Sequence, residues 1–170
     1  MQVRAADELH RVMSDFNLGW VTLEEPMSNL TEGGTRKRGR PHLSMTDQQR
    51  ADIAIWTRSY EIYALIKIKR TEFTTHWESD LHKLGKLLNR YGRRSGRSLR
   101  YTVFSAFISS KSSREVKSRL ENLNEIARLV AAKYDLLAKA ELDGDEHYWS
   151  KKGVSDWTCS AASVILRMMK

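Results

Sequence analysis

The chain has 170 residues, of which 41% are hydrophobic and 29% are charged, and its formal net charge is +8. This length suits one domain, residues 1–170, with a core that buries roughly 70% of the surface that the unfolded chain exposes. No run of about 18 apolar residues is present, so no membrane-spanning helix is expected. The excess of lysine and arginine favours a polyanionic partner.

The N-terminal residues 1–13 mix charges into a helical pattern, so no secretory signal is expected. The single cysteine, Cys159, cannot form an internal disulfide, which suits a reducing compartment. We therefore expect a cytoplasmic protein without a membrane partner.

The first half of the chain alternates between helical and strand periods. Apolar residues at helical spacing predict a helix over residues 5–16, and an apolar run closed by proline predicts a strand over 19–26. Residues 28–49 have little apolar periodicity and much Gly, Thr, Arg and Ser, which predicts a long, flexible basic loop. Two strands over 50–56 and 62–70 are predicted to form a hairpin.

The second hairpin strand ends in two lysines, Lys67 and Lys69. Side chains alternate along a strand, so both lysines are expected on one face. The opposite face is expected to carry Ile62, Ala64, Ile66 and Ile68. The first hairpin strand places Asp52 on one face with Ala54 and Trp56. Alternatively, the lysines mark an edge strand whose charges block unwanted pairing.

After the hairpin, large apolar residues at helical spacing predict a helix over residues 77–91 that ends at Gly92. The next element is a strand over 101–108. It is largely apolar, so we expect it to be buried on both faces of the sheet.

The last part of the chain begins with a long helix, predicted over residues 112–137 with Ser113 as a candidate N-cap. Residues 137–144 are predicted to form the last strand, and residues 156–170 fit either a helix or a strand. The order of elements predicts an α/β fold, a mixed central sheet flanked by helices.

Arginine is concentrated in two short stretches that contain glycine, RKRGR at 36–40 and NRYGRRSGRSLR at 89–100. Such clusters attract polyanions, although either one alone also fits a solvated loop. We expect phosphate or base contacts from both clusters and from a nearby glutamine. The candidate residues are Arg36, Arg38, Arg40, Gln48, Arg93, Arg94 and Arg97.

The pentapeptide KRGRP at 37–41 resembles the core of an AT-hook. In that motif, arginines that flank a glycine lie along the narrow minor groove of A·T-rich DNA. Here Gly39 permits the close approach and Pro41 keeps the exit extended. Even as a generic basic arm, the segment precedes the strand of Asp52 and is placed to wrap a duplex.

The element order, with Asp52 on one hairpin strand and Lys67-Ile68-Lys69 on the next, resembles the PD-(D/E)xK nuclease superfamily. The resemblance covers about residues 5–130 and implies the restriction-endonuclease-like fold. It also implies a DNA-directed phosphodiester hydrolase that uses Mg²⁺ or Mn²⁺, with Asp52 as metal ligand and Lys69 as catalytic lysine. A homodimer is a further expectation, because many nucleases of this fold pair up to cut two strands.

Lys67 stands where the family pattern has a second acid. An ammonium there repels Lys69 by about 4 kcal/mol at a separation of about 4 Å and should weaken metal binding, and it can pair with Asp52 instead. We therefore predict weak or absent hydrolysis. Lys67 is open to three explanations: a change made or selected in this copy, a natural pseudo-nuclease that only binds, or a catalytic acid recruited from elsewhere.

The acids that could be recruited are Glu8, Glu61, Glu72, Glu78 and Asp80. Glu8 has separate support as a catalytic candidate, because nucleases of this fold often use an acid from the first helix. A solvated surface residue is the alternative for Glu8.

Two other functions fit the same basic chain. A non-catalytic nucleic-acid-binding protein on a nuclease scaffold would bind duplex DNA with a steep dependence on salt and without divalent ions. An interaction domain whose basic surface meets an acidic protein would bind no nucleic acid.

Overall fold

The computed structural model describes residues 2–15, 19–26, 50–71, 76–95, 97–142, 147–149 and 157–169. In chain order, the elements within these ranges are α1 (Gln2–Asp15), β1 (Gly19–Pro26), β2 (Arg50–Thr57), β3 (Ile62–Thr71), α3 (Trp77–Tyr91), the 3-10 helix η1 (Arg93–Ser95), β4 (Tyr101–Ser110), α4 (Ser113–Tyr134), β5 (Leu136–Leu142), β6 (His147–Trp149) and β7 (Trp157–Met168). The predicted flexible loop over 28–49, with Arg36, Arg38, Arg40 and Gln48, lies outside the described residues.

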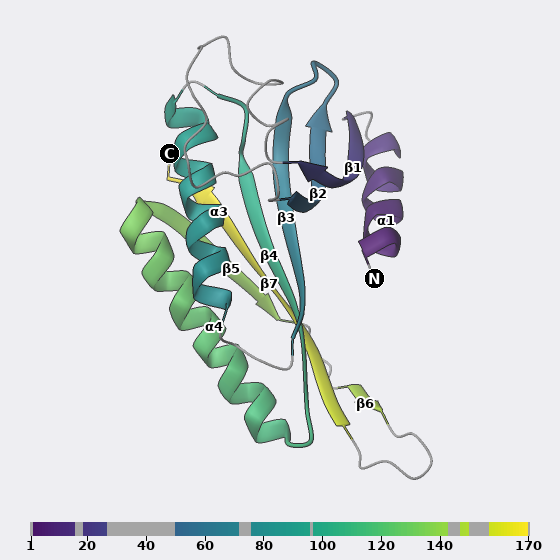
Figure 1. Cartoon of the computed structure of the whole chain (residues 1–170), viewed down its shortest axis with the longest axis vertical. Coiled ribbons are helices and arrows are strands. Elements are labelled where there is room, and N and C mark those ends of the chain that lie inside the picture. Colours follow the sequence, from purple (N-terminus) through teal and green to yellow (C-terminus); the bar gives the residue numbers. More distant parts are fainter. Residues whose placement is uncertain are drawn as a thin grey trace.

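The described strands form one mixed sheet of seven strands (Figure 1). β1, β2 and β3 are antiparallel neighbours, and β3 and β4 are parallel. β7 is antiparallel to β4 on one side and to β5 and β6 on the other. A parallel pair requires a crossover connection, and α3 lies in the one between β3 and β4. The α/β class and the predicted hairpin of β2 and β3 are confirmed.

Helices cover both faces of the sheet (Figure 1). α3 and α4 pack on one face over the larger core, in which Trp77 and Phe104 are buried. α1 packs on the other face, where Met13 contacts Ile55 and Ala64. Among the described residues, no helix combines the length and the apolar character needed to cross a membrane.

α3 and α4 approach each other closely at Gly85. A Cβ atom at this position would lie 2.6 Å from Cδ2 of Tyr134 on α4, which is closer than carbon atoms normally approach. The helix contact therefore requires glycine, although glycine weakens a helix interior by about 1 kcal/mol relative to alanine.

A register shift between β2 and β3 changes the face on which Ile62 lies. Ile55 pairs with Ala64, whereas Trp56 pairs with Ile62, so β3 contains one extra residue, Tyr63. Ile62 consequently packs with Trp56 in the larger core, and the prediction that it shares a face with Ala64 is wrong. Simple alternation contains no signal for such a bulge.

β4 is buried on one face only, so the prediction of burial on both faces is wrong. Its residues alternate between partly exposed and buried from Tyr101 to Ser110. α3 and α4 cover the buried side. The small core under α1 extends only as far as Tyr101, which leaves the rest of the opposite face partly exposed.

The C-terminal part of the chain differs from the prediction in three details. Residues 137–144 were expected to hold the last strand, but β5 is followed by β6 and β7. The open choice between helix and strand over 156–170 is settled as strand, because β7 pairs with strands on both sides. The N-cap of α4 is Ser112 and not Ser113, and its side chain makes no capping hydrogen bond.

Candidate functional site

Asp52, Lys67 and Lys69 lie on the face of the sheet that α3 covers. Ile53 pairs with Ile66, so the next residues along these antiparallel strands, Asp52 and Lys67, lie opposite each other. Lys69 follows two residues later on the same face of β3, where it contacts α3. The expectation that Lys67 and Lys69 share one face is confirmed, and Asp52 lies on that same face of the sheet.

The carboxylate of Asp52 is engaged at both oxygens, and the residue is only 5% exposed. Nζ of Lys67 donates a hydrogen bond to Oδ1 at 2.9 Å. The backbone N–H of Ile68 donates to Oδ2 at 2.6 Å. Nζ of Lys67 also lies 3.5 Å from the backbone oxygen of Arg50. The predicted ion pair of Asp52 with Lys67 is therefore present, and it neutralises the carboxylate.

A second ion pair joins β3 to α3. Nζ of Lys69 lies 3.1 Å from Oδ2 of Asp80, and Nζ of Lys83 lies 3.5 Å from Oδ1. Asp80 is 9% exposed, and its Oδ2 accepts no hydrogen bond. Lys69 is therefore attracted by charge, without the alignment that a hydrogen bond requires.

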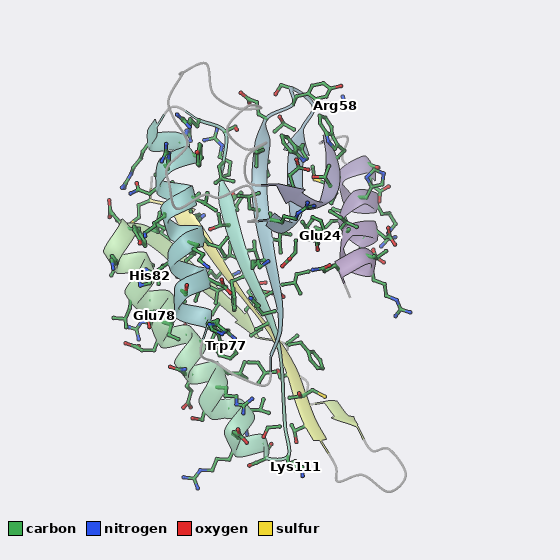
Figure 2. All side chains as sticks on the ribbon, in the orientation of Figure 1. Glu24, Arg58, Trp77, Glu78, His82 and Lys111 are labelled. Atoms are coloured by element: carbon green, nitrogen blue, oxygen red, sulfur yellow. The ribbon has the colours of Figure 1, made fainter. Side chains whose placement is uncertain are left out.

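Trp77 explains why Asp80 faces the sheet. The side chain of Trp77 lies at the start of α3 (Figure 2) and is buried. Its ring packs edge-on against Phe104 of β4, with 6.4 Å between the ring centroids. Residues three apart on a helix lie on the same side, so Asp80 follows Trp77 toward β3. A carboxylate in the first turn is also stabilised by the helix dipole.

The other acids considered for recruitment lie elsewhere. Glu8 is exposed on α1, on the opposite face of the sheet, and pairs with Arg11 at 2.7 Å. Glu61 is exposed at the hairpin and Glu78 is exposed on α3, whereas Glu72 lies outside the described residues. The expectation that Glu8 lies beside Asp52 as a recruited acid is wrong, because the sheet separates the two side chains.

The predicted arginine contacts lie at the other end of α3. Arg93 and Arg94 belong to η1, directly after α3, and Arg97 follows. Arg94 pairs with the aspartate that caps α4, and the guanidinium of Arg97 lies 4.8 Å from the centre of the Tyr91 ring. A helix rises about 1.5 Å per residue, so the first turn of α3 and Tyr91 are about 16 Å apart. The structure does not bring these arginines to the lysines.

The side chains around Asp52 do not fit Mg²⁺ or Mn²⁺ as the sequence stands. These ions need several oxygen ligands, but Asp52 offers one carboxylate whose two oxygens already accept N–H groups. Lys67 also places a positive charge 2.9 Å from that carboxylate. In the described part of the chain, no three His, Cys, Asp or Glu side chains are grouped to hold a metal ion.

The site can instead offer positive charge to an anion. The side chains of Lys67 and Lys69 are 27% and 33% exposed, so neither ammonium is sealed from solvent. Ammonium groups form strong, charge-assisted hydrogen bonds with phosphate oxygens.

Comparison with known proteins gave no relative from which a function could be taken. No family model, no curated protein and no solved structure matches the chain. Function must therefore be inferred from the chain's own residues and their geometry.

Proposed function

We propose that this chain is a DNA-directed nuclease of the PD-(D/E)xK type, with a restriction-endonuclease-like fold, in which Lys67 makes hydrolysis weak or absent. The observation that carries the proposal is the meeting of Asp52 with Lys67, beside Lys69, on adjacent strands. The element order supports it, because a helix, three strands, a second helix and a further strand follow one another as the resemblance implies.

The two lysines account for phosphate binding without efficient hydrolysis. Lys69 can stabilise the negative charge of a phosphate from the position that the family pattern gives its lysine. Lys67 occupies the position of the second acid and neutralises Asp52, so the carboxylates that hydrolysis needs are not available. Binding of a phosphodiester is therefore retained more readily than its cleavage.

DNA is the favoured polyanion because positive charge is present at both ends of α3. The lysines of β3 lie near its first turn, and Arg93 and Arg97 lie just beyond its last turn. Asp80, which Lys69 meets, and Tyr91 at the end of the helix are about 16 Å apart along α3, which corresponds to about five base pairs at about 3.4 Å each. A duplex along α3 could contact both groups.

Lys67→Glu tests the proposal, because it supplies the missing acid beside Asp52. The variant should nick plasmid DNA in Mg²⁺ or Mn²⁺ and lose this activity in EDTA, whereas the wild-type chain should show little or none. Adding Asp52→Ala to Lys67→Glu should abolish the cleavage again.

Two control variants separate a restored ligand from a changed charge. Lys67→Gln removes the ammonium without supplying a carboxylate and should cut nothing. Lys111→Glu makes the same charge change in the exposed turn between β4 and α4 and should also cut nothing (Figure 2). A folded Lys67→Glu protein that binds no metal ion and cuts no DNA contradicts the nuclease proposal.

A non-catalytic DNA-binding protein on the same scaffold is the second candidate. It is favoured by one observation, the engagement of both Asp52 oxygens by N–H groups of Lys67 and Ile68. This candidate predicts duplex binding that EDTA does not change and that weakens steeply with salt. It also predicts no cleavage after Lys67→Glu, so gel shifts beside the plasmid assay distinguish the two functions.

A further inference from the structure

The two lysines of β3 differ in how their carboxylate partners hold them. Lys67 donates a hydrogen bond to Asp52. Lys69 lies 3.1 Å from Oδ2 of Asp80, but this buried oxygen accepts no hydrogen bond. Charge-assisted hydrogen bonds are stronger than charge attraction without alignment, so the Lys69 pair is the easier one to exchange for another anion.

The surroundings of the Lys69 pair permit such an exchange. The side chain of Lys69 is 33% exposed and that of Asp80 is 11% exposed, so an anion can approach the ammonium without displacing α3. Lys83 donates a hydrogen bond to the other oxygen of Asp80 at 3.5 Å. Asp80 therefore keeps a positive neighbour even when Lys69 turns toward another anion.

We propose that Asp80 is a positioning residue for Lys69: its carboxylate holds the ammonium against α3 and competes with DNA phosphate for it. Carboxylate and phosphate both present anionic oxygens to an ammonium, so either can occupy the same donor. The inference rests on the proposed function, because it takes DNA as the source of the phosphate. It gives Asp80 a role in setting the affinity for DNA.

Asp80→Asn removes the charge that holds Lys69 and nearly preserves the shape of the side chain. The affinity for a short duplex, measured by fluorescence anisotropy in EDTA, should rise several-fold. The slope of log K against log salt should steepen by about 0.9, as expected for one added phosphate contact. Asp80→Glu keeps the charge and should retain the wild-type slope.

Glu78→Gln is the matched control for net charge. It removes one negative charge from the same turn of α3, where the Glu78 side chain is 71% exposed and lies 3.6 Å from His82 (Figure 2). The salt slope should stay at the wild-type value, because no lysine of β3 is released. Equal effects of Asp80→Asn and Glu78→Gln would overturn the proposal.

A second measurement does not depend on DNA. Reductive methylation with limiting reagent, followed by peptide mass spectrometry, reports how firmly each lysine nitrogen is held, because a nitrogen held against a carboxylate is shielded from the reagent. In Asp80→Asn, Lys69 should react faster, whereas Lys67 should keep its wild-type rate through its pair with Asp52. An unchanged rate at Lys69 would overturn the positioning role.

The two measurements distinguish failure of this inference from failure of the proposed function. If the wild-type chain binds no duplex but Lys69 reacts faster in Asp80→Asn, DNA binding fails and the positioning role is supported. If the chain binds duplex and Asp80→Asn changes neither the slope nor the rate, the positioning role alone fails.

Discussion

At the N-terminal end of α3, the lysines of β3 are partly buried and each meets a carboxylate, whereas the arginines at its C-terminal end lie closer to solvent. Lys67 pairs with Asp52, which is 5% exposed. Arg94 pairs with Asp135, and these side chains are 42% and 57% exposed. Arg97 is partly exposed and covers an aromatic ring.

This contrast separates two uses of positive charge in one protein. Removing one partner of a buried pair leaves an uncompensated charge, so such a pair constrains the geometry around it. Exposed pairs contribute little to stability and are screened by salt. We infer that the paired lysines at the N-terminal end of α3 determine the shape of the candidate site. The arginines at its C-terminal end supply general attraction for a polyanion.

The largest effect is expected for Lys67→Met, which should lower the free energy of unfolding by about 3 kcal/mol, because Asp52 would stay buried without its ammonium partner. Urea unfolding followed by circular dichroism measures the loss. Arg94→Met removes the cation of an exposed pair and should lower the same free energy by less than about 1 kcal/mol. Equal losses of unfolding free energy in the two variants would contradict the distinction between the two ends of α3.

A smaller effect is expected in the middle of α3, where Gly85 permits the close contact with Tyr134 of α4. Gly85→Ala should lower the free energy of unfolding by about 2 kcal/mol, because overpacking against Tyr134 outweighs the better helix propensity of alanine. Lys86→Ala, at the exposed neighbouring position, should change it by less than about 0.5 kcal/mol in the same urea titration. A more stable Gly85→Ala protein would show that α3 can move away from α4.

An effect on stability smaller than that of Gly85→Ala is expected for Arg97→Gln, which loses a cation–π contact of about 0.5–1 kcal/mol with Tyr91. If the proposed DNA binding is correct, the slope of log K against log salt should be shallower by about 0.9 for the Arg97→Gln protein than for the wild type, because one phosphate contact is lost. Arg128→Gln, on the exposed side of α4, is the control and should keep the wild-type slope. Identical slopes for the two variants in an anisotropy titration would exclude Arg97 as a phosphate contact.

Alternation along β3 was sufficient to place Lys67 and Lys69 on one face, because successive side chains of any strand point to opposite sides. The same rule failed at Ile62, since the extra residue Tyr63 shifts the register within the strand. Local periodicity is therefore reliable only where the strand pairing is regular.

Asp80 could have been singled out by its place on the apolar side of α3. It lies three residues after Trp77 and four before Leu84, both of which are buried. An acid at such a position needs a partner, because an unpaired buried carboxylate is costly. The sequence did not identify Lys69 as that partner, because the choice depends on how α3 lies across the sheet.

Local periodicity was enough to predict most of the helices and strands in the regular segments and the face on which most of their charged residues lie, because the helical and strand periods are properties of the backbone. Three features depend on how distant segments pack: Glu8 lies across the sheet from Asp52, residues 157–168 form an inner strand, and Lys69 meets Asp80. These outcomes depend on pairing and burial between segments far apart in the chain. Such contacts leave no trace in the local periodicity and can override local preference.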